Sequence, residues 1–198
     1  MPPPKTVNLD AHAVATLRYI RASMEAAAGV AIPGSAGIVM GIVGFAAAAV
    51  CLLLPLKEHW YVVWLSAAPV AASAGGMLLA RPASLLSFAA NGTPGRKLAM
   101  CLLPSLFAGA AMTIVLWRGE RMDAVPGTWL LLYGCGLISA SVPTTTLVAW
   151  MGISFVALGI AAHFASFVLQ MILLGLGFGG LHILFGILIG RVGYGRES

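Results

Sequence analysis

One histidine, His182, lies deep in the last apolar run of the sequence, residues 171–190, among glycines. At about 100° per residue, an α-helix over this run places the histidine on one stripe with four glycines. These glycines are Gly175, Gly179, Gly186 and Gly190. The leucines of the run fall on the opposite side and are expected to face lipid: Leu173, Leu181, Leu184 and Leu188. An imidazole at this depth needs a hydrogen-bond partner on another helix, or a ligand.

Two roles for His182 follow from its position. In the structural interpretation, the imidazole bridges to a backbone carbonyl or a hydroxyl group of a neighbouring helix. In the alternative, His182 is the single axial ligand of a haem or another tetrapyrrole, because adjacent glycines let a macrocycle approach the helix. A second haem ligand is missing at similar depth, since His12, His59 and His163 lie near or beyond the ends of the expected spans. We therefore expect no cofactor and keep the tetrapyrrole as the alternative.

Other site chemistry has little support in the sequence. It contains no Ser–His–acid set, no metal-spaced cluster and no phosphate-binding glycine loop between a strand and a helix. The three cysteines, Cys51, Cys101 and Cys135, are dispersed among apolar residues and are expected to be buried packing residues. No dense basic stripe favours nucleic acid as a partner. The chain is therefore expected not to be an enzyme.

Small residues form a second stripe in the first apolar run, at Gly37, Gly41 and Gly44. In lipid, apolar burial does little to join helices, so close approach of backbones at small residues must supply the association. We therefore predict that the first and last spans pack antiparallel through Gly37, Gly41 and Gly44 against Gly175, Gly179 and Gly186. His182 is expected to face inward near this contact.

The composition predicts an integral membrane protein of the all-α class. Hydrophobic residues make up 60% of the 198 residues and charged residues only 9%, too few charges to cover the surface of a soluble domain. Six apolar runs are long enough to cross a hydrocarbon core of about 30 Å. The predicted spans are, approximately, residues 35–55, 60–80, 98–117, 127–142, 147–163 and 168–190.

The first and fourth spans begin alike. Ala31-Ile-Pro-Gly-Ser35 precedes the first span and Ala124-Val-Pro-Gly-Thr128 precedes the fourth, and Gly41 and Gly134 match at the same offset. The offset fails elsewhere, so the match is only a slight indication of a three-plus-three repeat.

Residues 1–34 form a separate amino-terminal region before the membrane domain of residues 35–198. Its apolar residues recur at helical spacing, with Arg18 and Arg21 on the polar side. We expect an amphipathic helix in the membrane interface, with both arginines at lipid headgroups. The alternative is a helix that docks a soluble partner.

Positive charge predicts the orientation. Eight of the 11 Lys and Arg residues lie in the amino-terminal region, the 81–97 loop and the tail, and three lie on the other side. The positive-inside rule then places both termini in the cytoplasm. Trp60, Trp64, Trp117 and Trp129 fall together at the outer interface, as an aromatic belt does.

Several motifs resemble a family of uncharacterised bacterial multi-pass membrane proteins common in Acidobacteria-like genomes. They are Leu17-Arg-Tyr-Ile-Arg21, Ile32-Pro-Gly34, Gly127-Thr-Trp-Leu-Leu-Leu-Tyr-Gly134 and Gly177-Phe-Gly-Gly-Leu-His-Ile-Leu-Phe-Gly186. The resemblance covers most of the chain and implies placement in the bacterial inner membrane. The family brings no established activity.

The expected function is that of a non-enzymatic accessory, scaffold or sensing subunit in the inner membrane. Its expected partners are the lipid bilayer and a membrane or cytoplasmic protein, or a second copy of the chain. The first alternative is a small-solute transporter or channel, although coupled carriers usually keep Asp or Glu within the bundle and these spans contain none. The second is a tetrapyrrole- or pigment-binding subunit that uses His182.

Overall fold

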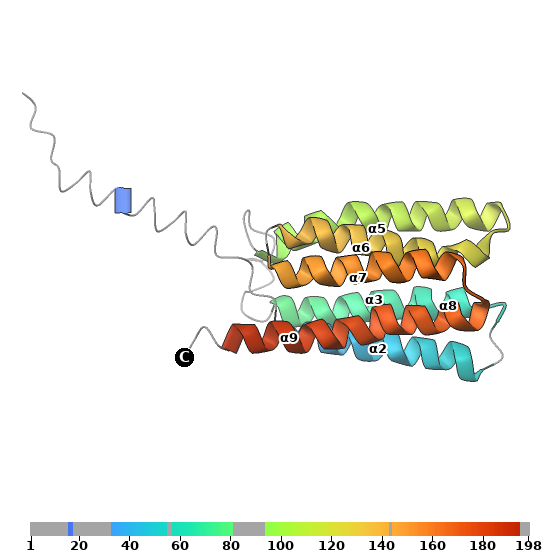
Figure 1. Cartoon of the computed structure of the whole chain (residues 1–198), viewed down its shortest axis with the longest axis horizontal. Coiled ribbons are helices and arrows are strands. Elements are labelled where there is room, and N and C mark those ends of the chain that lie inside the picture. The colour runs from blue at the N-terminus through green and yellow to red at the C-terminus, as the bar shows by residue number, and fades with distance from the viewer. Residues whose placement is uncertain (1–15, 18–32, 55–56, 81–93, 143, 195–198) are drawn as a thin grey trace, which may run out of the picture.

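The computed structural model describes residues 16–17, 33–54, 57–80, 94–142 and 144–194, and every regular element within these ranges is helical (Figure 1). The elements are α2 (Gly34–Leu53), α3 (Trp60–Ala80), α5 (Pro94–Arg118), the 3-10 helix η1 (Met122–Ala124), α6 (Val125–Ser141), α7 (Thr146–His163), α8 (Phe167–Leu174), the π-helix η2 (Gly175–Leu181) and α9 (His182–Tyr194). The last three are consecutive and form one rod.

Among the described residues, six helices are long and apolar enough to cross a membrane, the α8–η2–α9 rod being one of them. This confirms the predicted all-α class and the number of spans. Large apolar side chains on the outside agree with a lipid environment: Phe107 is 74% exposed, Trp117 65% and Trp150 59%. In a soluble protein such side chains would mostly be buried.

The six helices form two groups of three (Figure 1). In the first triplet, α2 packs against α3 and against the α8–η2–α9 rod. In the second triplet, α6 packs against both α5 and α7. The triplets thus combine spans 1, 2 and 6, and spans 3, 4 and 5, and do not follow the consecutive halves of a three-plus-three division.

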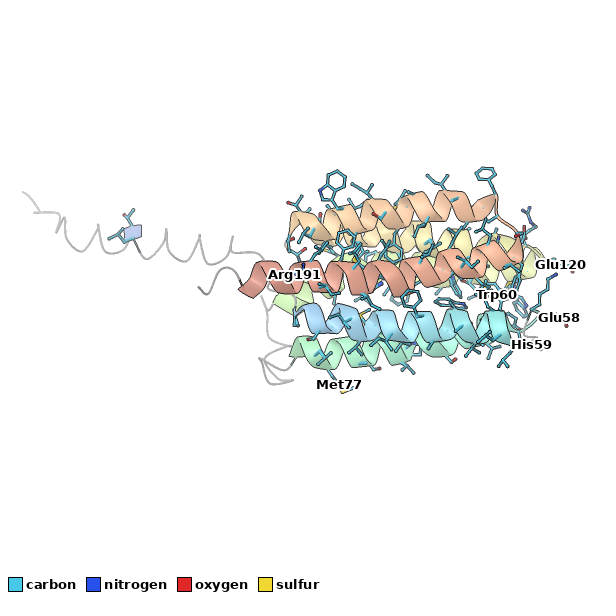
Figure 2. All side chains as sticks on the ribbon, turned by 60° about the horizontal axis from the view of Figure 1, so that its bottom comes forward. Glu58, His59, Trp60, Met77, Glu120 and Arg191 are labelled. Carbon is cyan, nitrogen blue, oxygen red and sulfur yellow. The ribbon has the colours of Figure 1, made fainter. Side chains whose placement is uncertain are left out.

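Both ends of the membrane domain lie on the same side of the bundle, because Gly34 packs against Gly186 and Gly190. We call this side the Arg191 end. Figure 2 shows Glu58, His59 and Glu120 at the opposite end, called here the Glu120 end.

Local sequence explains how several helices begin and end. Pro126 occupies the first turn of α6, where its missing N–H costs no hydrogen bond. Thr145 caps α7, since its Oγ1 accepts a hydrogen bond from the Leu147 backbone N–H at 3.0 Å. Helix α5 ends in a Schellman turn: Arg121 N–H donates to the Leu116 carbonyl, and Glu120 N–H donates to the Trp117 carbonyl.

The core lies between the triplets. Its fully buried side chains include Leu130 and Phe155 from the second triplet and Met171 and Leu174 from the first. Trp60 and Trp64 also belong to it, each only 5% exposed. The prediction that these two tryptophans form part of an interfacial belt is therefore wrong, because both rings point into the bundle.

The predicted lipid-facing leucine side of the last span is also largely wrong. Leu184 is 51% exposed, but Leu173 is only 9% exposed, and Leu181 and Leu188 pack against the core. The π-helix explains Leu173. In a continuous α-helix, Leu173 and His182 would lie about 180° apart around the helix axis, on opposite sides. A π turn holds one extra residue, which reduces the angle between the two side chains to about 80°.

The cysteines differ in environment. Cys51 is buried, as predicted, with its thiol 3.8 Å from the Trp60 carbonyl oxygen, whereas Cys101 is half-buried and Cys135 is exposed. The predicted burial is therefore wrong for Cys135, which lies on the outer side of α6. Most of the predicted amino-terminal amphipathic helix, including Arg18 and Arg21, lies outside the described residues.

Candidate functional site

The candidate site is the buried pair of Tyr133 on α6 and His182 on α9. The Tyr133 hydroxyl oxygen lies 2.8 Å from His182 Nε2, and this hydrogen bond joins the two triplets. On the other side of the ring, His182 Nδ1 lies 3.4 Å from the carbonyl oxygen of Gly177. His182 is 5% exposed. The imidazole thus bridges between a hydroxyl group of the neighbouring helix and a backbone carbonyl.

The two partners define which nitrogen carries the proton. A carbonyl oxygen only accepts hydrogen bonds, so the contact with Gly177 requires the proton on Nδ1. In the neutral ring Nε2 is then an acceptor, and the Tyr133 hydroxyl donates to it. A neutral imidazole therefore satisfies both ring nitrogens, which a buried polar group in a membrane requires.

Aromatic rings surround the pair. The His182 ring centroid lies 5.5 Å from that of Phe155 and 6.2 Å from that of Phe178, whose ring stacks on it. Phe178 also contacts Tyr133 at 5.1 Å and Trp64 at 5.8 Å. We call Trp64, Tyr133, Phe155, Phe178 and His182 the aromatic cluster.

A tetrapyrrole bound by His182 would have to displace a hydrogen bond. The Tyr133 hydroxyl lies at Nε2, and Nδ1 faces the Gly177 carbonyl, so a metal ion at Nε2 would take the place of the hydroxyl group. Two of the adjacent glycines, Gly177 and Gly179, are closely packed. A Cβ atom at Gly177 would lie 2.6 Å from Leu130, and one at Gly179 would lie 2.7 Å from the Phe45 ring.

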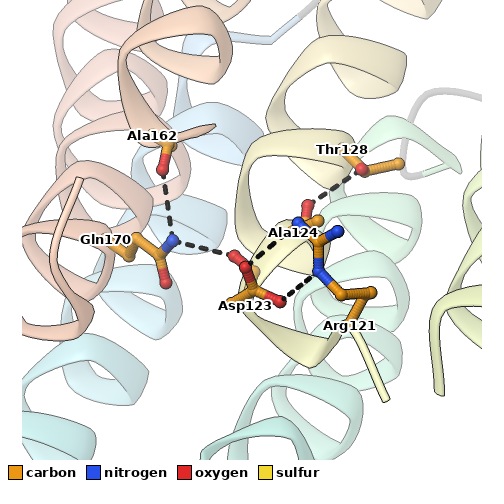
Figure 3. A network of polar contacts seen from close by, with 6 residues as sticks. All are labelled: Arg121, Asp123, Ala124, Thr128, Ala162 and Gln170. Carbon is orange, nitrogen blue, oxygen red and sulfur yellow. Dashed lines mark hydrogen bonds and ion pairs between the residues drawn. The ribbon is translucent and has the colours of Figure 1, made fainter. Parts of the chain in front are cut away.

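A second buried polar side chain, Gln170 on α8, was not predicted. It is 6% exposed, and its amide nitrogen donates to the carbonyl oxygens of Asp123 at 2.8 Å and Ala162 at 3.2 Å (Figure 3). Gln170 therefore ties the first triplet to both η1 and α7 of the second. The signal was present in the sequence, because Gln170 is the only glutamine of the chain and lies within an apolar run.

The glycines predicted to join the first and last spans lie at the contact between α2 and the rod. A Cβ atom at Gly37 would lie 2.9 Å from the His182 carbonyl oxygen, and one at Gly41 would lie 2.6 Å from that of Gly179. The other glycines predicted for this contact, on α2 and on the rod, have equally close neighbours. Gly44 faces Phe178, Gly175 faces Ala48, and Gly186 faces Gly34.

The order of these glycine contacts along the chain shows that α2 and the rod are antiparallel. We call the glycines that join α2 to the rod the α2–rod glycine contact. The backbone of His182 lies at it, while the imidazole points away from α2 toward α6 and α7.

A second glycine contact, between α6 and α7, was not predicted as a pair. Gly134 packs against Gly152, and Gly159 lies against the Gly127 carbonyl, where a Cβ atom would be 3.0 Å away. Gly127 also contacts the His163 ring, whose Nδ1 lies 2.8 Å from the Gly159 carbonyl. On each helix the two glycines are seven residues apart, and this spacing in the sequence could have indicated the contact.

Charged groups gather at the Glu120 end. Arg121 and Asp123 form an exposed ion pair with 3.2 Å between Nε and Oδ1 (Figure 3), and Lys57 Nζ lies 6.0 Å from the Phe167 ring centroid. Within the described ranges, no three His, Cys, Asp or Glu side chains are grouped as a metal site would need. A scan of protein-family models and searches of curated proteins and solved structures find no match to the chain.

Proposed function

We propose that the chain is a non-enzymatic multi-pass protein of a bacterial inner membrane, an accessory, scaffold or sensing subunit that works with a protein partner. One observation carries the proposal. Two buried polar side chains among the described residues, His182 and Gln170, both form hydrogen bonds between the triplets. Their polar groups hold helices together, which is a structural role.

The bacterial setting is part of the same proposal. It rests on the resemblance of the Gly127–Gly134 and Gly177–Gly186 motifs to bacterial inner-membrane proteins. The proposed orientation has the Arg191 end in the cytoplasm. The positions of Lys57, Arg118 and Arg121 near the opposite end support it, since the side with fewer basic residues is the outer one.

The partner is tested by purification of the full chain in mild detergent after cross-linking in cells. A photo-reactive residue at an exposed position within a span, such as Phe107, is expected to give a discrete adduct with a membrane partner, and one at Arg191 with a cytoplasmic partner. Adducts of the chain with itself would identify a homo-oligomer. Monomeric protein without any adduct from a series of exposed positions would contradict the proposal.

A small-solute transporter is the second candidate, and the division into two triplets favours it. Backbones approach closely within each triplet, whereas the triplets meet mainly through large side chains, as is expected of two bodies that move against each other. Solute flux into liposomes that contain the purified protein, lost in the Tyr133→Ala variant, would favour transport over the accessory role.

The orientation is tested by cysteine labelling. In a chain without its native cysteines, Glu58→Cys is expected to react with a membrane-impermeant maleimide added to intact spheroplasts. A cysteine in place of Arg191 is expected to react only after the membrane is opened. The reverse pattern would overturn the proposed orientation.

The proposal also requires no cofactor. Purified protein is expected to show no absorbance band in the visible range. A strong band that is lost in His182→Ala and retained in the matched variant His59→Ala would support the tetrapyrrole alternative instead.

A further inference from the structure

The contacts between the two triplets differ in kind from the contacts within each triplet. Within each triplet, backbones meet at glycines, as at Gly41 with Gly179 and Gly134 with Gly152. Between the triplets, large side chains meet: Tyr133 and Phe155 pack against Phe178. Each triplet is therefore a more rigid body than the pair.

The hydrogen bonds between the triplets are unevenly distributed along the bundle. Near the Glu120 end, Gln170 binds two carbonyl groups of the second triplet, and the three residues Phe164–Ser166 connect α7 directly to α8. In the middle lies the Tyr133–His182 hydrogen bond. Beyond it toward the Arg191 end, no further hydrogen bond joins the triplets among the described residues, where the buried side chains are apolar, as at Val148 and Phe185.

A shallow surface groove of about 540 Å³ lies between α7 and the rod, lined by Ser154 and Ala157 of α7 and by Gly180 and Leu184 of the rod. The rod itself is π-helical at this level, with four glycines between residues 175 and 180. Gly175 and Gly179 of this segment lie in the α2–rod glycine contact, so the π-helical part of the rod belongs to the rigid body of the first triplet.

We propose that the two triplets move against each other as rigid bodies about a hinge at the α7–α8 connection, and that the Tyr133–His182 hydrogen bond holds the closed state. Gln170 keeps the Glu120 end together, so the bundle opens at the Arg191 end. The opened state would expose the aromatic cluster toward that side of the membrane. This device is independent of whether the protein is an accessory subunit or a transporter.

Distances between spin labels test the hinge in full-length protein in lipid nanodiscs, after the native cysteines are replaced. The first pair, Trp150→Cys and Ile187→Cys, spans the triplets near the Arg191 end. The second pair, Ile160→Cys and Val168→Cys, spans them near the hinge. The third pair, Ile42→Cys and Leu184→Cys, lies within the first triplet, and all these positions are at least 40% exposed.

Tyr133→Phe removes the hydrogen bond and keeps the ring. It is expected to raise the population of longer distances in the first pair about threefold, which corresponds to the roughly 0.6 kcal/mol typical of a hydrogen bond between membrane helices. The second pair should change less and the third not at all. Tyr61→Phe, which removes a hydroxyl group outside the aromatic cluster, should leave all three pairs unchanged.

Three outcomes would overturn the proposal. The first is an unchanged distribution in the Trp150–Ile187 pair when Tyr133 is replaced. The second is equal broadening of the Ile42–Leu184 pair, which would mean general loosening of the fold. The third is a larger change near the α7–α8 connection than at the Arg191 end, which would place the hinge elsewhere.

Discussion

Gly134 on α6 and Gly152 on α7 face each other. A Cβ atom on Gly134 would lie 2.7 Å from the Gly152 carbonyl oxygen, and one on Gly152 would lie 2.8 Å from the Gly134 carbonyl oxygen. The α2–rod glycine contact has the same design, because Gly34 and Gly41 on α2 meet Gly186 and Gly179. In both contacts the glycines are seven residues apart on each helix. Each triplet is thus built on one antiparallel helix pair whose backbones touch.

The reciprocal contact predicts a large effect of a single methyl group. Gly152→Ala is expected to destabilise the fold by about 2–3 kcal/mol, because the new Cβ atom meets backbone, which cannot rotate away. Denaturant titration of the purified protein in micelles measures the free energy of unfolding.

Gly76→Ala on α3 is the matched control for this change. No atom lies within 4 Å of a Cβ at that position, so the variant should be neutral or stabilised by up to about 1 kcal/mol through helix propensity. Equal destabilisation of both variants would contradict the close α6–α7 contact.

The α2–rod glycine contact predicts a second difference. Gly179→Leu should weaken the fold more than Leu184→Ala, because the first fills the space against the Phe45 ring and the second trims a side chain that is 51% exposed. We expect a loss of about 2 kcal/mol or more for Gly179→Leu, as for other overpacked contacts. The midpoint of thermal unfolding in detergent ranks the two variants. A lower midpoint for Leu184→Ala would contradict the prediction.

The Tyr133–His182 pair predicts non-additive losses. Tyr133→Phe leaves His182 Nε2 without a donor, and His182→Leu leaves the Tyr133 hydroxyl without an acceptor. Each single change should lower the unfolding free energy by about 0.6–2 kcal/mol, the range for hydrogen bonds between membrane helices.

The double variant separates this penalty from lost packing. It should cost less than the two single changes added together, because no polar group of the pair then stays unsatisfied. Additive losses in a double-mutant cycle of unfolding free energies would show that the hydrogen bond contributes nothing.

The sequence predicted some features of the fold correctly, and these can be named at particular residues. The apolar runs predicted all six spans, with the second placed at residues 60–80 and found at Trp60–Ala80. Small-residue periodicity also indicated the face of α2 that carries Gly37, Gly41 and Gly44. Both signals are local, since they depend only on composition and helical spacing.

What the sequence did not show depends on contacts between distant segments. Tyr133 is the partner of His182 although 49 residues separate them, and nothing local distinguishes its hydroxyl group from others. Trp60 and Trp64 look like interfacial residues, but Trp60 packs against Trp129 of the second triplet and Trp64 against Phe178 of the rod. The π-helix rotates α8 relative to α9, so a strictly α-helical pattern placed Leu173 on the wrong side.

The turn after α5 predicts a stabilising substitution. Glu120 has a φ of 56° and is the one non-glycine residue with positive φ among the described residues. A left-handed conformation costs a side-chain-bearing residue about 1 kcal/mol or more, and glycine does not incur this cost. Glu120→Gly should therefore raise the unfolding free energy by about 1 kcal/mol while the Arg121 and Glu120 backbone hydrogen bonds of the turn remain.

Glu120→Ala separates this backbone effect from the loss of a charge. Alanine keeps the Cβ atom and so retains the strain of the left-handed conformation, and its stability should stay close to that of the original protein. The comparison uses thermal unfolding of the three proteins in the same detergent. If Glu120→Ala gains as much as Glu120→Gly, the gain comes from removing the carboxylate and not from the backbone, and the predicted strain at residue 120 would be refuted.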